Sequence, residues 1–143
     1  LKKIGLKNIE LQINSIGCKK CRATYKEVLH EFLQSKLNKL CEDCQRRFNT
    51  NILRILDCKR RSCQKQLKKA PKHTDYLCDE CSNHFDRVKE LLQKSNVNFV
   101  FNPYLVRGLD YYTKTVYEFI SPMLGAQDAV GGGGRHQRSI DVR

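Results

Sequence analysis

Hydrophobic and polar positions divide the chain into an extended beginning, a helical middle and an extended end. Ile9, Leu11 and Ile13 alternate with polar residues, which predicts a half-buried strand that ends at residues 15–17. Residues 22–40 contain neither Pro nor Gly, and their apolar side chains recur at helical spacing. The sequence therefore predicts one strand followed by one long helix.

Shorter helical patterns fill the rest of the middle. Residues 43–48, 52–56 and 64–69 each predict a short helix, with a polar break at residues 49–51 between the first two. Residues 79–95 predict a longer helix, whose acidic first turn suits a helix N-terminus.

The period changes again towards the end of the chain. Residues 97–101 and 112–120 alternate in the manner of strands. Residues 121–125 predict a turn, after which residues 126–130 return as the second arm of a hairpin and run into the four glycines 131–134.

The 143-residue length allows one ordinary domain, or a small domain that carries an insertion. The sequence has no apolar run of about 20 residues, which a membrane helix needs, and no apolar run of the signal-peptide kind near residue 1. We therefore expect a cytoplasmic protein without a membrane partner.

The eight cysteines are the unusual feature of the composition. They form four close pairs: Cys18 and Cys21, Cys41 and Cys44, Cys58 and Cys63, and Cys78 and Cys81. Two sulfurs three residues apart can hold one ion from a single turn, so the spacing favours metal, in particular structural zinc. Disulfides would need a secreted protein, and free thiols are the remaining alternative.

Two groupings of the four pairs are compatible with four-sulfur zinc sites. If residues 22–40 form one unbroken helix of about 30 Å, the first two pairs cannot share an ion. The nested grouping then follows, with Cys18, Cys21, Cys78 and Cys81 on one ion and Cys41, Cys44, Cys58 and Cys63 on the other. A kink near Ser35 would permit sequential grouping instead. His84 either replaces a sulfur or lies exposed on its helix.

Positive charge gathers in the same region as the cysteines. The chain has 27 Lys and Arg against 15 Asp and Glu, and residues 18–74 hold 16 of the former and 5 of the latter. This excess predicts a surface that binds the phosphate backbone of RNA, although a merely solvated surface is the alternative. The basic candidates are Lys19, Lys20, Arg22, Arg46, Arg47, Lys59, Arg60, Arg61, Lys65, Lys68, Lys69 and Lys72.

Residues 105–113, Leu-Val-Arg-Gly-Leu-Asp-Tyr-Tyr-Thr, are the densest in chemically useful side chains. Arg107 could hold a phosphate or carboxylate with two hydrogen bonds. Farther on, Gln127 precedes the glycine run and Arg135. That run forms either the flat floor of a ligand pocket or a flexible loop.

These motifs resemble the catalytic domain of histidyl-tRNA synthetase, a class II aminoacyl-tRNA synthetase, along the chain as far as Arg135. Residues 105–113 resemble the first histidine-specific signature of that family, and residues 125–127 with 131–135 resemble its second. Residues 13–17, 40–47 and 53–57 also match. The expected fold class is therefore α+β, a partial class II antiparallel sheet with a helical, cysteine-rich, zinc-binding insertion.

The resemblance implies a histidine–tRNA ligase, which activates histidine with ATP and Mg²⁺ and transfers it to tRNA(His). It makes Arg107 the catalytic arginine, placed against the α-phosphate. The histidine pocket would be lined by Tyr111, Tyr112, Gln127, Gly131, Gly132, Gly133, Gly134 and Arg135. It also implies that the parent enzyme is a homodimer and that the insertion lies over the tRNA acceptor stem.

Four segments are expected: a core strand segment at 1–17, the basic zinc-binding insertion at 18–80, core helix and strands with the pocket motifs at 81–135, and an atypical tail at 136–143. The tail departs from the Tyr-Asp-Gly-Leu that the family places after Arg135, and fits no strand. The ATP-binding arginine motif, the dimer-forming motif and the anticodon-binding domain are absent. We therefore expect a fragment of a larger enzyme that is inactive by itself.

Two other functions compete with this interpretation. A non-catalytic, synthetase-like regulatory subunit of ATP phosphoribosyltransferase would have a similar pocket, but is not expected to carry the basic insertion. A free-standing, zinc-stabilised RNA-binding module would not need the strands after Val97.

Overall fold

A four-stranded sheet forms the centre of the computed structural model, which describes residues 8–108, 111–121 and 129–136. Its strands are β1 (Glu10–Ser15), β2 (Val100–Phe101), β3 (Tyr112–Ile120) and β4 (Ala129–His136), in the order β2-β1-β3-β4. Strand β1 pairs parallel with β2, whereas β1 with β3 and β3 with β4 are antiparallel. The predicted α+β class with a mainly antiparallel sheet is confirmed.

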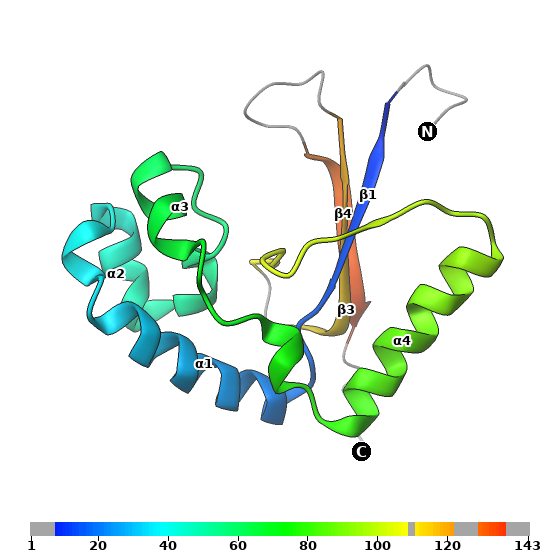
Figure 1. The fold of residues 1–143 in the computed structure, drawn as a ribbon, viewed down its shortest axis with the longest axis horizontal. Helices are drawn as coiled ribbons and strands as arrows, with labels where there is room; N and C mark the ends of the chain where they lie inside the picture. Colours follow the sequence, from blue (N-terminus) through cyan, green and yellow to red (C-terminus); the bar gives the residue numbers. More distant parts are fainter. Residues whose placement is uncertain (1–7, 109–110, 122–128, 137–143) are drawn as a thin grey trace, which may run out of the picture.

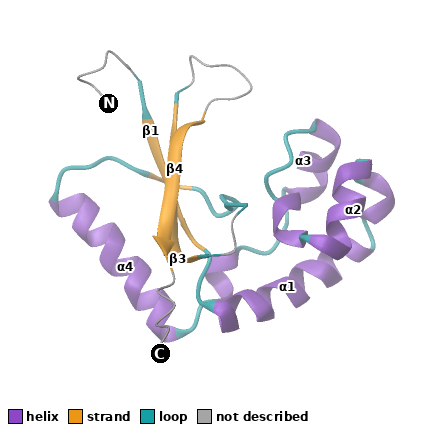
Figure 2. Cartoon of the chain, turned by 180° about the vertical axis from the view of Figure 1, so that it is seen from behind, coloured by secondary structure: helices purple, strands orange, loops and turns teal. Residues whose placement is uncertain are grey.

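In the described ranges, four α-helices flank the sheet. Helices α1 (Lys19–Gln34), α2 (Glu42–Thr50) and α3 (Arg61–Leu67) gather on one side, and α4 (Asp79–Lys94) lies on the other (Figures 1 and 2). None of the helices in the described parts of the chain has the length and apolar character needed to cross a bilayer.

The first helix is shorter than predicted at its C-terminal end. It ends at Gln34, and a 3₁₀ turn at Leu37–Lys39 follows. The backbone N–H of Lys36 donates to the carbonyl of Leu33, so the hydrogen bonds tighten from four-residue to three-residue spacing. Apolar side chains continue through this turn and Leu40 is buried. For this reason the pattern alone extended the helix too far.

The helices on the cysteine-rich side have a hydrophobic core of their own. Tyr25, Leu29 and Leu33 of α1 are fully buried and pack with residues of α2, α3 and the intervening turns. A second, smaller cluster consists of Ile16, Leu105, Tyr112 and Val116. The helical part therefore does not depend only on the sheet for burial of its apolar side chains.

The end of the sheet differs from the sequence-based expectation in two respects. The glycine run lies inside β4, with Gly131 to Gly134 opposite Phe119 to Val116 of β3, so the flexible-loop interpretation is wrong. His136 also belongs to this strand, because it pairs with Tyr112, although no strand was expected after Arg135. Strand pairing uses backbone groups, which glycine supplies without any side-chain pattern.

The strand predicted at residues 97–101 is also shorter in the structure, where it covers only Val100–Phe101.

Candidate functional site

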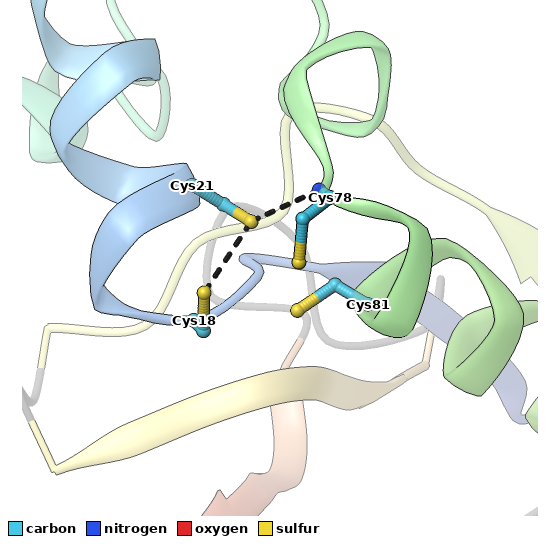
Figure 3. A group of neighbouring side chains, drawn as sticks. All are labelled: Cys18, Cys21, Cys78 and Cys81. Carbon is cyan, nitrogen blue, oxygen red and sulfur yellow. Dashed lines mark hydrogen bonds between the residues drawn. The ribbon is translucent and has the colours of Figure 1, made fainter.

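The first cysteine centre joins the start of α1 to the start of α4. The sulfurs of Cys18, Cys21, Cys78 and Cys81 lie within 4.8 Å of one another and point towards a common centre (Figure 3). The backbone N–H of Cys78 donates to Cys21 Sγ at 3.2 Å, across 57 residues of sequence. This centre therefore closes the helical part of the chain at its two ends.

The second cysteine centre lies within the helical part. The sulfurs of Cys41, Cys44, Cys58 and Cys63 also lie within 4.8 Å of one another. Here the N–H of Cys41 donates to Cys63 Sγ at 3.2 Å. The structure thus brings the cysteines together in the nested grouping, although the argument for that grouping assumed a longer first helix.

The N-terminal residues of the four helices position most of these sulfurs. Cys21, Cys44, Cys63 and Cys81 each occupy the third position of a helix, and in three of the four helices another cysteine is the N-cap residue. The exception is α3, whose N-cap is Arg60, and its partner cysteine lies two residues earlier, which explains the wider spacing of that pair. Thiolates at helix N-termini are stabilised by the positive end of the helix dipole.

Both centres fit a zinc ion. Four sulfurs at about 2.3 Å from zinc in a tetrahedron lie about 3.8 Å apart. The sulfurs of Cys18 and Cys21 are 3.5 Å apart, and those of Cys41 and Cys58 are 3.9 Å apart. All eight cysteines are free, since a disulfide would require about 2 Å. The two groups could therefore each hold a metal ion.

The thiols within each centre differ in acidity. The backbone N–H of Cys21 is the main reason that the pKa of Cys18 falls to about 7. Burial raises the pKa of Cys81 to about 12, and it also raises the pKa of Cys44. Because a metal binds thiolates, loading these centres must release protons from the buried members.

His84 is neither a sulfur substitute nor a fully exposed histidine. Its Nε2 lies 3.2 Å from the hydroxyl oxygen of Thr115 on β3, with which it shares a hydrogen bond. Burial and the positive charge of Arg135 lower the pKa of His84. This histidine connects α4 with the sheet.

Arg107 lies between a carboxylate and the glycine strand. Its Nη1 donates to Glu118 Oε1 at 2.7 Å, and Glu118 is paired in register with Gly132. A Cβ atom at Gly132 would lie 2.8 Å from Arg107 Nη1, which is closer than real contacts allow. The missing side chain is therefore what lets the guanidinium lie against β4.

Aromatic rings gather next to this arginine. The ring of Tyr111 lies 4.7 Å from that of Tyr112 and 4.8 Å from that of His136, between ring centroids. Tyr112 is buried, whereas Tyr111 is 46% exposed. A Cβ atom at Gly134 would lie 2.8 Å from the Tyr112 ring, so this glycine also makes room for a neighbour.

The expected pocket residues divide between the two faces of β4. A Cβ atom at Gly132 or Gly134 would meet the side chain of Arg107 or Tyr112, respectively, whereas one at Gly133 would meet the ring of Tyr117 on the opposite face. By the same alternation, Arg135 lies on the same face of β4 as Gly133. Lys114 is the main cause that lowers the pKa of Glu80 on α4, and the charge of Arg135 lowers it further. Gly131 has no atom within 4 Å of its ideal Cβ position. Gln127 lies outside the described residues.

Most of the expected basic residues are exposed, with two exceptions. Arg22 is half-buried and donates to the backbone carbonyl of Tyr112, and Arg47 donates to that of Arg54 at 3.4 Å. The exposed residues are Lys19 and Lys20 on α1, Arg46 on α2, Arg61 and Lys65 on α3, Lys59 and Arg60 just before α3, and Lys68, Lys69 and Lys72 after it.

Sequence reasoning did not find Glu118. Its only signal is a carboxylate within a strand otherwise rich in Thr, Tyr and apolar residues, and that signal does not name its partner. The pairing with Arg107 depends on the path of the loop before β3, which places the arginine beside Glu118 of that strand. Only the three-dimensional structure supplies this.

The fold matches the class II aminoacyl-tRNA synthetases. In a crystal structure of apo Staphylococcus aureus histidyl-tRNA synthetase, the superposition covers 94% of this chain and 32% of that one, with a TM-score of 0.63 and 32% sequence identity. No family model matches the chain.

The particular proteins that the chain resembles are histidine–tRNA ligases. It is 52% identical to that of Caldanaerobacter subterraneus subsp. tengcongensis over 99% of this chain and 34% of the relative. It is 53% identical to that of Thermosipho melanesiensis over 98% of this chain and 33% of the relative. The predicted resemblance is thus confirmed, and the chain spans about a third of the length of the curated relatives it matches.

Proposed function

We propose that the chain is part of a histidine–tRNA ligase, to which it contributes the arginine that stabilises the reacting phosphate and part of the histidine pocket. The observation that carries this proposal is the position of Arg107. Its guanidinium is held by Glu118 at 2.7 Å, lies against Gly132 and belongs to a chain about half identical to histidine–tRNA ligases. The parent enzyme is proposed to be a cytoplasmic homodimer.

The arginine acts through charge and fixed geometry. A guanidinium has five N–H donors, and the bond to Glu118 occupies only one side of the group. The remaining donors can face the α-phosphate of ATP, where negative charge grows while the carboxylate of histidine attacks. ATP supplies the adenylyl group and Mg²⁺ would balance the charge of the phosphates. Holding Arg107 in advance lowers the reorganisation needed during the reaction.

The aromatic group forms one wall of the proposed histidine pocket. Tyr112 is buried and its ring is kept in place by the close approach of Gly134. Tyr111 is more exposed and lies beside it. Tyr112 is therefore the better candidate for contact with the substrate imidazole, with Tyr111 at the pocket entrance.

The cysteine centres are proposed to hold two structural zinc ions. Four sulfurs fill the tetrahedral coordination of each ion and leave no position for a reacting water. The first centre fixes the start of α1 to the start of α4, and the second fixes the turns around α2 and α3. Zinc would thus stabilise the basic part of the chain and take no part in catalysis.

The exposed basic residues of this zinc-stabilised part are proposed to contact the acceptor stem of tRNA(His). The 16 Lys and Arg at residues 18–74 outnumber 5 Asp and Glu, and this part has its own hydrophobic core. A rigid positive surface of this kind suits the regular phosphate backbone of a stem.

The decisive experiment is Arg107→Ala in the full-length ligase that contains this chain. The rate of adenylate formation, measured by pyrophosphate exchange, should fall by about a hundredfold or more. The affinity for histidine should change little. Lys39→Gln, a charge change elsewhere on the surface, is the matched control. An unchanged rate of adenylate formation in Arg107→Ala would refute the role assigned to this arginine.

A further inference from the structure

The segment that leads to Arg107 leaves β2 through a turn that begins at Asn102. The backbone N–H of Leu105 donates to the carbonyl of Asn102 at 3.1 Å, and Asn102 Oδ1 accepts the N–H of Tyr104 at 3.1 Å. Pro103 suits the second position of such a turn, because its ring fixes φ near the value required there. These bonds lie within the turn and fix its shape. Its place against the sheet requires contacts with another element.

Asn14 of β1 supplies such contacts. Its side-chain Nδ2 donates to the carbonyl of Pro103 at 3.1 Å and to that of Leu105 at 2.9 Å, across 89 and 91 residues of sequence. An amide nitrogen has two hydrogens, so both are used. The residue is fully buried. One side chain of the sheet thus holds the backbone of the turn just before the segment reaches Arg107.

These hydrogen bonds fix the orientation of the Asn14 amide. If the amide were reversed, Oδ1 would face two carbonyl oxygens and no hydrogen bond would form. In the observed orientation, Oδ1 is buried and has no hydrogen-bond partner among the described residues. An unpaired buried oxygen lowers the stability of a protein. Stability alone therefore does not explain an asparagine at this position.

The side chain of Arg107 is held at its tip, where Nη1 donates to Glu118 Oε1 at 2.7 Å. An arginine side chain has many rotamers, so a bond at the tip fixes the guanidinium only if the backbone at its root is also fixed. Before the arginine, Leu105 packs in the smaller cluster beside the sheet, and Val106 packs in the core of the helical part. The hydrogen bonds of Asn14 fix where the backbone passes between these two cores.

We propose that Asn14 is a positioning residue for adenylate formation. Through the carbonyls of Pro103 and Leu105, it places the backbone from which Arg107 extends to the reacting phosphate. The proposal rests on the role of Arg107 in the proposed function. Asn14 donates its hydrogen bonds to the protein, so its effect on the reaction passes through the arginine. Glu118 and Asn14 then fix the two ends of one catalytic side chain.

The test compares variants of the full-length ligase that contains this chain. Asn14→Ala removes both donors, so the kcat of adenylate formation, measured by pyrophosphate exchange, should fall by about ten- to a hundredfold. The KM for histidine should change little, because the rings of Tyr111 and Tyr112 are unchanged in this variant. Asn14→Thr supplies one hydroxyl donor and suits a strand, so it should recover part of the rate.

A double variant shows whether the effect passes through the arginine. In the Arg107→Ala background, Asn14→Ala should lower the rate by less than about twofold, because no guanidinium is left to be misplaced. Circular dichroism verifies that each variant is folded. A role of Asn14 that is independent of the arginine would give the same fractional loss of rate with or without Arg107, and that result would overturn the proposal.

Tyr25→Phe is the matched control for a general loss of stability. Tyr25 is also fully buried, and its hydroxyl donates to the carbonyl of another proline, Pro71, at 2.8 Å. The variant loses this hydrogen bond in the helical part, so it should lower the midpoint of urea unfolding without lowering kcat. If Tyr25→Phe lowers kcat as much as Asn14→Ala does, loss of stability explains both effects and the proposal is wrong.

The role of Arg107 is tested separately by Arg107→Ala alone. If that variant leaves the rate of adenylate formation unchanged, the proposed function of the arginine fails, and this inference fails with it. If Arg107→Ala lowers the rate as expected while Asn14→Ala lowers stability and leaves kcat unchanged, only the positioning role of Asn14 is wrong.

Discussion

The guanidinium of Arg107 and the carboxylate of Glu118 form an ion pair at 2.7 Å, with side chains only 26% and 17% exposed. Such partial burial reduces screening by solvent, so the pair holds the arginine more firmly than a surface pair would. Because Glu118 faces Gly132 across the β3–β4 ladder, the direction of the arginine is set by strand register.

Glu118→Gln in the full-length ligase should therefore lower kcat for adenylate formation by about ten- to a hundredfold, because a displaced arginine meets the reacting phosphate less well. The KM for histidine should change little, since Glu118 makes no contact in the aromatic group described above. Glu118→Asp, which keeps the charge, should recover part of the rate. A fall in thermal stability without any change in kcat would contradict a positioning role.

The glycine run offers a matched pair of substitutions. Gly132→Ala places a Cβ 2.8 Å from Arg107 Nη1 and 2.9 Å from the carbonyl oxygen of Tyr117, whereas Gly131→Ala meets nothing within 4 Å. Gly132→Ala should lower the free energy of unfolding by about 1–3 kcal/mol. Gly131→Ala should leave it within about 0.5 kcal/mol. Urea unfolding of both variants measures the difference, and equal effects would contradict the described contacts.

Zinc content gives a direct test of the two centres. Elemental analysis of chain purified without added metal should give about two zinc ions per molecule, and Cys81→Ser or Cys44→Ser should each reduce this to about one. Loss of one sulfur removes a ligand from one centre only, because the other lies in a separate group. Eight titratable thiols and no zinc would refute the zinc proposal.

His73 predicts a dependence of stability on acid pH. Its ring is fully buried and stacks on Tyr25 at 4.2 Å, and neither ring nitrogen has a hydrogen-bond partner among the described residues. Burial, with a smaller effect of Arg22, lowers its pKa from 6.5 to about 3. The unfolded chain then binds the proton first, so stability is full above pH 6.5 and is lost as the pH falls towards 3.

The comparison with His73→Phe isolates this effect, since phenylalanine keeps a stacking ring but does not titrate. Between pH 6.5 and 4 the unmodified chain should lose up to about 1.4 kcal/mol per pH unit more than the variant does. Urea unfolding at matched zinc content measures both slopes, because acid also protonates the cysteine ligands. Identical slopes would show that His73 is not kept neutral by burial.

The long periodic segments could be predicted from the sequence, and the irregular ones could not. Strand β3 has the predicted bounds, and α4 differs by one residue, because both have a clear apolar period. The first helix was extended past Gln34 because Leu37 and Leu40 keep helical spacing through a 3₁₀ turn. The second arm of the hairpin was predicted at residues 126–130, whereas β4 runs on through the glycines to His136, because glycines carry no side-chain pattern.

The candidate site was predictable where spacing along the chain decides it. The cysteines group as the nested scheme expects, since even the shorter α1 separates Cys21, in its first turn, from Cys41, which lies beyond its C-terminal end as the N-cap residue of α2. The partnership of Arg107 with Glu118 depends on strand register and on the path of a loop. Neither the strand register nor the path of the loop can be recognised from a sequence motif.

The tie between the starts of α1 and α4 bears on how such a chain can change during evolution. The polypeptide leaves the sheet after Gly17 and comes back at Cys78, and the N–H of Cys78 touches the sulfur of Cys21. A segment that departs and returns at one point can be lengthened, exchanged or lost while the strands on either side stay in place. The same four sulfurs that hold the helices would thus make this part of the molecule a separable addition to the sheet.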